Sequence, residues 1–129
     1  TAAERDALGY LHGNCGHCHN SSVNRVPLPL NLAQSAAAPV AGLAAVLAST
    51  VGARSRYTPP GHTGDPQVVV PGQPSSSVLA LRMQSRQLPV QMPPLGTSLP
   101  DPEGLALVHR WIGHALAIQD SEAPKETLP

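Results

Sequence analysis

The two cysteines of this chain and the histidine behind them are the residues best suited to carry chemistry. Cys15 and Cys18 stand three positions apart in the stretch NCGHCHN, and His19 follows the second cysteine directly. A thiol pair with this spacing can cycle to a disulfide, contribute to a zinc site, or attach a larger group covalently. Each possibility makes a different demand on the rest of the chain.

Two of these possibilities leave part of the pattern unused. A redox dithiol usually follows a strand of a mixed sheet, whereas the residues before Cys15 have a helical pattern and His19 would have no role. A structural zinc site takes four protein ligands, and the chain has no second cysteine pair. The remaining candidate ligands lack the spacing of a second half-site: His17, His62, His109 and His114.

Covalent haem attachment uses all three residues. Thioether bonds would join the sulfurs of Cys15 and Cys18 to the porphyrin vinyl groups, and the imidazole of His19 would ligate the iron. Cysteines about one helical turn apart can reach neighbouring vinyl groups, and a histidine next to the second lies under the ring. The pattern therefore favours one haem c over the dithiol and zinc alternatives, which stay open.

The composition leaves room for such a group. The 129 residues suit one domain, yet they include no Phe, one Trp and two Tyr, with 15 Pro and 11 Gly. Aromatic rings normally supply much of the buried area in a core. A haem is large, flat and mainly apolar, so its burial would replace several of them.

Charge and hydropathy exclude two classes of partner. The formal net charge is zero and charged residues are spread along the chain, so we expect no nucleic-acid partner. No apolar run reaches the roughly 18 residues of a membrane span; the most apolar one, residues 40–51, is shorter. The chain begins at Thr1 without a signal peptide, which is consistent with removal of a targeting segment or a larger upstream region.

The pattern predicts an all-α fold of three to five helices with long Pro/Gly-rich loops. An opening helix over residues 1–14 has capping-box spacing between Thr1 and Glu4. Further helices are expected over 38–56 and 75–87, the last of these capped by a serine among residues 75–77. A closing helix begins at Pro102 behind an Asp101 cap. We expect a domain over residues 1–119 and a polar tail or linker over 120–129.

With the attachment motif in place, residues 1–118 resemble a class I c-type cytochrome. That family opens with a helix that leads into the motif and is crossed by the C-terminal helix. Ala7 and Leu11 match its small and bulky positions, and Trp111 matches the aromatic residue of the closing helix. The resemblance implies the cytochrome c fold around a covalently attached haem. It also implies a periplasmic or secreted location, because thioether formation takes place outside the cytoplasm.

Three segments are similar to a narrower bacterial type, whose domains are often fused to larger secreted or periplasmic proteins. They are VVVPGQPSSSVLALRM, MPPLGT and DPEGLALVHRWIGHAL. In that type the methionine before Pro-Pro is the second iron ligand, which here is Met92. The residues agree, because Met92 precedes Pro93 and Pro94 in a stiff loop. Met83 lies on a predicted helix where methionine normally packs into the core, and His62 is the third candidate.

The remaining site residues follow from the needs of a bound haem. The free ring nitrogen of His19 needs a hydrogen-bond acceptor; in the family a loop proline carbonyl serves, so Pro27 is the first candidate and Pro29 the second. Propionates need cations or hydroxyl groups when buried. Candidates for them are Arg54, Arg56, Tyr57 and Arg82. The alternating Leu28, Leu30 and Leu32 are expected to wrap one haem face.

These expectations favour a monohaem electron carrier rather than an enzyme, acting alone or as a module of a larger redox protein. Its partners would be other redox proteins: a dehydrogenase, an oxidase or oxygenase, or another cytochrome. We expect a monomeric domain. The alternative is a haem enzyme or gas sensor with a labile sixth ligand, such as a peroxidase-like protein, which a fixed Met92 disfavours.

Overall fold

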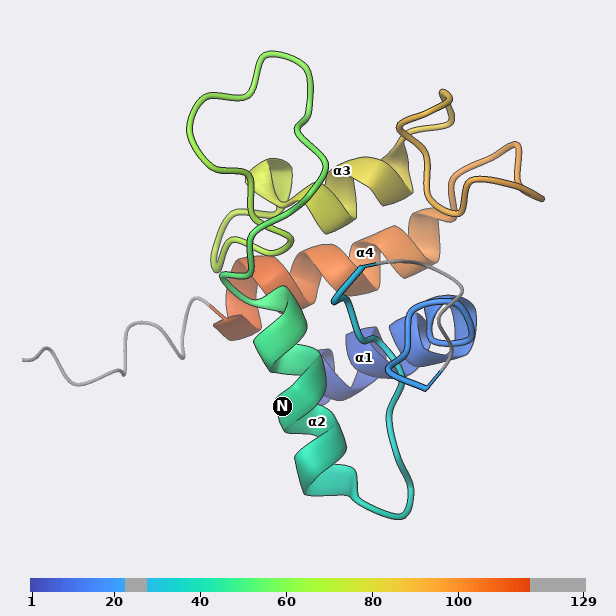
Figure 1. Cartoon of the computed structure of the whole chain (residues 1–129), viewed down its shortest axis with the longest axis vertical. Helices are drawn as coiled ribbons and strands as arrows, with labels where there is room; N and C mark the ends of the chain where they lie inside the picture. Colours follow the sequence, from blue (N-terminus) through green and yellow to red (C-terminus); the bar gives the residue numbers. More distant parts are fainter. Residues whose placement is uncertain (23–27, 117–129) are drawn as a thin grey trace, which may run out of the picture.

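Helices and long loops make up the part of the chain that the computed structural model describes, residues 1–22 and 28–116. The four α-helices are α1 (Ala2–Cys15), α2 (Pro39–Thr50), α3 (Val78–Gln84) and α4 (Pro102–Arg110) (Figure 1). A 3₁₀ turn, Pro74–Ser76, precedes α3, and a π-helical turn, Trp111–Ala115, extends α4. Within the described ranges there is no β-strand, only two isolated bridges. The predicted all-α class is confirmed, while the domain boundary at 119/120 lies outside the described residues.

Local caps fix the starts of the first and last helices, as the sequence predicts. Oγ1 of Thr1 accepts a hydrogen bond from the backbone N–H of Glu4 at 3.1 Å. Oδ1 of Asp101 accepts from the N–H groups of Glu103 and Gly104, both at 3.1 Å. These bonds satisfy N–H groups that have no partner inside the helix.

The second helix is shorter than the predicted span 38–56. It ends at Thr50 because the next residues pair with a distant segment. Val51 forms a parallel bridge with Val69, and Arg54 an antiparallel bridge with Gln67. Gly52 turns the chain between them with φ of 68°, a conformation that glycine adopts without strain.

The third helix is also shorter than the predicted span 75–87. Ser77 stands at its N-cap position, but its side chain makes no capping bond. Its hydroxyl accepts from Val70 N–H at 2.9 Å and donates to the carbonyl of Gln73 at 2.8 Å. The predicted serine cap is therefore absent. The Ser77 hydroxyl instead hydrogen-bonds to the preceding turn, and the α-helix starts only at Val78.

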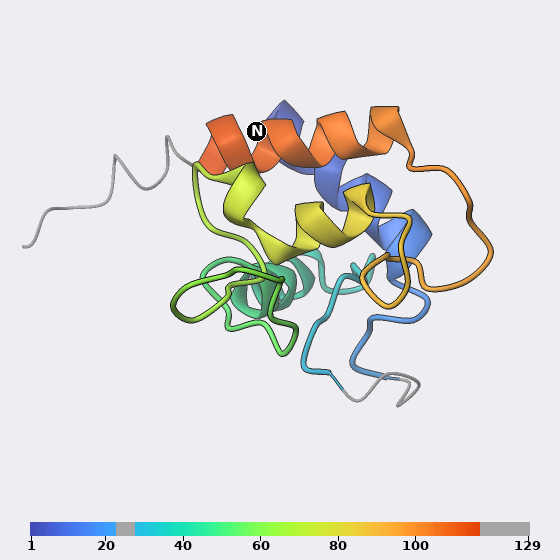
Figure 2. The same ribbon diagram turned by 90° about the horizontal axis from the view of Figure 1, so that it is seen from above.

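The core lies where α1 crosses α4 and its π-helical extension, with α3 on the other side of α4 (Figures 1 and 2). Ala7, Leu11 and Trp111 are all fully buried in the core cluster, as expected for a helix crossing. At the same crossing Tyr10 lies over Gly104, where an added Cβ would overlap its ring. The Tyr10 hydroxyl donates to Oδ2 of Asp101 at 3.0 Å.

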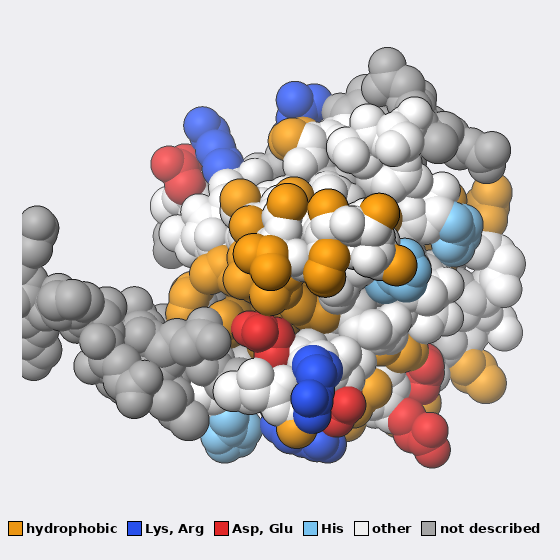
Figure 3. All heavy atoms as spheres, turned by 90° about the horizontal axis from the view of Figure 1, so that it is seen from below, with side chains coloured by type: hydrophobic (Ala, Val, Ile, Leu, Met, Phe, Trp, Pro, Cys, Tyr) orange, Lys and Arg blue, Asp and Glu red, His pale blue; other side chains and the backbone are white. Residues whose placement is uncertain are grey.

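The second helix stands apart from this three-helix unit and points away from it (Figure 1). Its inner residues Val46 and Thr50 are buried, whereas residues 36–41 at its N-terminal end are all exposed and all apolar. Figure 3, which views the molecule from that end, shows hydrophobic side chains gathered in the middle of the face. None of the described helices has the length and apolar character needed to cross a membrane.

Candidate haem site

A large cavity opens between the end of α1, the inner side of α2, α3 and the loop after it. Its volume is about 1160 Å³, above the roughly 300–1,000 Å³ of common small-molecule sites. Most of its lining is apolar, which suits a flat apolar group. The apolar wall includes Leu28, Leu30, Leu32, Ala45, Ala48, Val68, Val78 and Leu79. The three alternating leucines, which are predicted to wrap one haem face, thus line the cavity.

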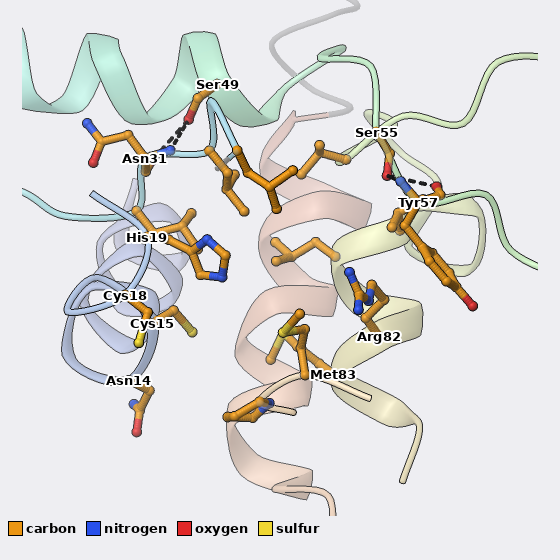
Figure 4. A pocket seen from close by; sticks show the side chains of 18 of the residues that line it. Asn14, Cys15, Cys18, His19, Asn31, Ser49, Ser55, Tyr57, Arg82 and Met83 are labelled. Atoms are coloured by element: carbon orange, nitrogen blue, oxygen red, sulfur yellow. Dashed lines mark hydrogen bonds between the residues drawn. The ribbon is translucent and has the colours of Figure 1, made fainter. Parts of the chain in front are cut away.

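All three residues of the attachment motif face this cavity. Cys15 is the last residue of α1, and its carbonyl accepts from the N–H groups of Cys18 at 3.2 Å and His19 at 2.9 Å. These bonds turn the chain back on itself, so both sulfurs and the imidazole lie on the same side (Figure 4). The helix thus delivers the two thiols and the ring to a single wall.

The environment of Cys15 does not suit the reactive thiol of a redox dithiol. Both cysteines are free thiols. Burial, and to a smaller extent the neighbouring Cys18, raises the pKa of Cys15 to about 11. Reactive dithiols have a depressed pKa that supplies the nucleophilic thiolate at neutral pH. Cys15 stays protonated there.

The ligand set does not suit structural zinc either. Among residues 1–22 and 28–116, no three His, Cys, Asp or Glu side chains come together in a group that could hold a metal ion. A structural zinc site needs four such ligands. A covalently attached haem needs two sulfurs for its thioether bonds and one imidazole as an iron ligand, and all three groups line the cavity.

His19 has the properties of a ligating imidazole. Burial, the charge of Arg82 and the proximity of His17 lower its pKa, which keeps the ring in the neutral form that binds iron. Its Nδ1 is buried and has no hydrogen-bond partner among the described residues. A ligating ring normally donates from that nitrogen to a carbonyl. The first candidate, Pro27, lies outside the described residues, and Pro29 lines the cavity.

Both methionines also line the cavity, but they differ in their packing. Met83, on α3, packs against the core cluster, as predicted for a helical methionine. Met92 is half-buried and is not part of the packing around that cluster. Its N–H donates to the carbonyl of Arg82 at 2.9 Å, which holds the loop beside α3. His62 does not belong to the lining.

Arginines gather around the cavity although they are spread out in the sequence. Four of the eight Lys and Arg residues line it: Arg54, Arg56, Arg82 and Arg86. Among the described residues, Asp101 is the only acidic one in the lining. Arg54 pairs with Asp65 at 3.6 Å, but both side chains are largely exposed, so this ion pair contributes little to the stability of the fold.

Arg82 is more enclosed than the other two arginines that are candidates for binding propionates, Arg54 and Arg56. Its guanidinium lies 4.5 Å from the centre of the Tyr57 ring, a cation–π contact. Burial lowers the pKa of Arg82, and Tyr57 opposes the effect. In Figure 4, Arg82 and Met83 reach from α3 into the cavity, and His19 points into it from the opposite side.

The structure separates the predicted site residue Trp111 from the cavity and adds an arginine that was not predicted. Trp111 is buried in the core and does not line the cavity, so its role is packing at the helix crossing. His109 and His114 line a separate hollow. Arg86 is the addition. It follows Arg82 by four residues within the predicted helix span 75–87, and that spacing was the available signal, although α3 ends at Gln84.

No family model, no curated protein and no solved structure matches the chain.

Proposed function

We propose that this chain is a monohaem electron-transfer protein of the c type. Cys15 and Cys18 would hold the haem through thioether bonds, and His19 and Met92 would ligate the iron. One observation carries the proposal: two free thiols and a neutral imidazole open onto a single large apolar cavity that both methionines also line. A six-coordinate haem supplies a one-electron iron couple without an open position for substrate.

The chain's own residues would bind and orient that group. The Nδ1 of His19 has no partner in the described part of the chain, and an acceptor there would fix the ring. The leucines of residues 28–32 would exclude water from one side of the ring. The backbone N–H of Leu32 donates to the carbonyl of His19 at 2.8 Å, so this segment is tied directly to the motif.

The charges around the cavity support a dianionic ligand. Arg82 is half-buried and faces the cavity without a carboxylate partner among the described residues. Its Nε and Nη2 already donate to backbone carbonyls, and a haem propionate would add a counter-charge to the half-buried guanidinium. Tyr57 stacks on the same guanidinium and would steady it.

The location and partners belong to the same proposal. Covalent attachment in bacteria implies a periplasmic or secreted protein, and its partners would be a dehydrogenase, an oxidase or oxygenase, or another cytochrome. Leu95 and Leu99 belong to the cavity lining and are 82% and 77% exposed. They would give a partner an uncharged surface beside the haem.

A spectroelectrochemical titration of the matured protein tests this function. We expect a reversible one-electron transition, a far-red thioether band in the oxidised form, and no carbon monoxide complex of the reduced form within the mixing time. Rapid binding of carbon monoxide with turnover of peroxide would instead indicate the haem enzyme or gas sensor. A colourless protein would contradict haem binding altogether.

A further inference from the structure

Arg82 on α3 and Arg86, two residues beyond the end of that helix, reach across to the loop that carries Met92. Arg82 and Arg86 are both half-buried, and both line the cavity. The extended backbone of Ser85 separates Arg86 from the helix, yet hydrogen bonds from both side chains converge on residues 89–92. Both guanidinium groups are engaged by backbone carbonyls.

Arg82 holds the loop from both its main chain and its side chain. Its carbonyl accepts from the N–H of Met92 at 2.9 Å. Its Nε donates to the carbonyl of Val90 at 2.9 Å, and Nη2 donates to that of Pro89 at 3.3 Å. Three bonds thus join one residue of α3 to residues 89–92.

Arg86 links the two methionine backbones. Its Nη2 donates to the carbonyl of Met83 at 2.6 Å, and Nη1 donates to that of Met92 at 3.4 Å. The second bond is long, but both contacts come from one rigid guanidinium fork. Arg86 therefore braces the Met92 backbone against the helix that carries Met83.

The carbonyl contacts also explain how two cations can lie beside an apolar cavity. Neither guanidinium has a carboxylate within ion-pair distance in residues 1–22 and 28–116. Half-buried charges need hydrogen bonds in place of water, and hydrogen bonds to charged groups are stronger than neutral ones. These carbonyls belong to the Met83 and Met92 backbones and to the residues just before Met92.

We propose that Arg82 and Arg86 are positioning residues that clamp residues 89–92 against α3 and so fix Met92 as the sixth iron ligand. The inference rests on the proposed function, and it explains why Met92 rather than Met83 would ligate the iron. Met92 has few core contacts of its own. The hydrogen bonds from the two arginines restrict the backbone of residues 89–92 and so hold the Met92 thioether in place.

Loss of the clamp should leave the iron open for a larger share of the time. A hydrogen bond to a charged group contributes about 1.5–3 kcal/mol. We apply this energy to the equilibrium between iron-bound and released Met92. At about 1.4 kcal/mol per factor of ten, the fraction of protein with Met92 released should rise roughly ten- to hundred-fold. Cyanide binding to the oxidised protein, which requires an open position, should accelerate by the same factor.

The test compares five variants of the matured holoprotein: Arg82→Lys, Arg86→Lys, Arg86→Gln, Met92→Ala and Arg110→Gln. The two lysine variants keep the charge but lose the guanidinium fork. Arg110 is an exposed cation at the end of α4, so Arg110→Gln controls for loss of one charge. The readouts are the far-red thioether band, the cyanide binding rate and the midpoint potential.

We expect both lysine variants and Arg86→Gln to weaken the far-red band and to bind cyanide at least about ten-fold faster, toward the behaviour of Met92→Ala. Arg110→Gln should match the wild type. A purely electrostatic role would give a different result: the lysine variants would match the wild type and only Arg86→Gln would shift the potential. That result overturns the clamp.

The two proposals fail in different ways. An unchanged band and cyanide rate in all three clamp variants overturns the clamp and leaves the haem protein intact. A wild-type protein without covalent haem overturns the proposed function, and the clamp falls with it. If Arg86→Gln yields no holoprotein, the two lysine variants decide.

Discussion

Replacing Gly104 by alanine should destabilise the protein, although alanine is the better helix former. Gly104 lies in the first turn of α4, and helix propensity alone favours alanine by about 1 kcal/mol. The added Cβ would overlap the Tyr10 ring, which packs against the core from α1. Overpacking of this kind costs about 1–3 kcal/mol. The two terms leave a net loss of about 1 kcal/mol in the free energy of unfolding.

A double-mutant cycle separates the clash from the propensity. In a Tyr10→Ala background the ring is gone, so Gly104→Ala should become stabilising by up to about 1 kcal/mol. Gly9→Ala is the matched control, because no atom lies within 4 Å of its added Cβ; it should stabilise α1 by about 0.5–1 kcal/mol. The measurement is urea unfolding of the holoprotein, followed by far-ultraviolet circular dichroism. If Gly104→Ala stabilises the wild-type background as Gly9→Ala does, the account of the crossing is wrong.

Three further predictions concern the Tyr10 hydroxyl, the Ser77 hydroxyl and the two methionines. Burial and the hydrogen bond to Asp101 raise the pKa of Tyr10 to about 12 from 10.0. Its contribution to stability is therefore complete below pH 10 and lost as the pH rises through 12, so Tyr10→Phe should flatten alkaline unfolding curves in that window; an identical slope would argue against it. Ser77→Ala leaves the Val70 N–H without its acceptor and should cost about 1–3 kcal/mol in urea unfolding, whereas the exposed Ser75→Ala should change little; equal effects would count against this role of the Ser77 hydroxyl. Met83→Ala should lower stability with the oxidised spectrum unchanged, while Met92→Ala should abolish the far-red band; the reverse pattern would assign the iron to Met83, and no change in either would point to a histidine such as His62.

Features fixed by neighbouring residues could be predicted from the sequence. The caps at Thr1 and Asp101 depend on side chains within three residues of the N–H groups that they satisfy. The apolar stripe through Ala7 and Leu11 needs only the helical period. The placement of Cys15, Cys18 and His19 on one cavity wall follows from a single tight turn at the end of α1.

Features that depend on distant partners could not be predicted. The second helix stops at Thr50 because Val51 pairs with Val69, and no local pattern contains that pairing. The place of Gly104 under Tyr10 depends on the angle at which α1 and α4 cross. The gathering of four arginines around the cavity arises only when α3 and the loop after α2 come together, although the sequence spreads its charges evenly.

The mass of the fully denatured protein tests the central claim most directly. Protein matured in a bacterial host that is competent in haem attachment should be extracted with acid acetone and weighed intact. Thioether bonds from Cys15 and Cys18 predict the mass of the polypeptide plus one haem, with the colour retained by the protein. The mass of the bare polypeptide, with the haem in the acetone phase or none at all, would contradict the account.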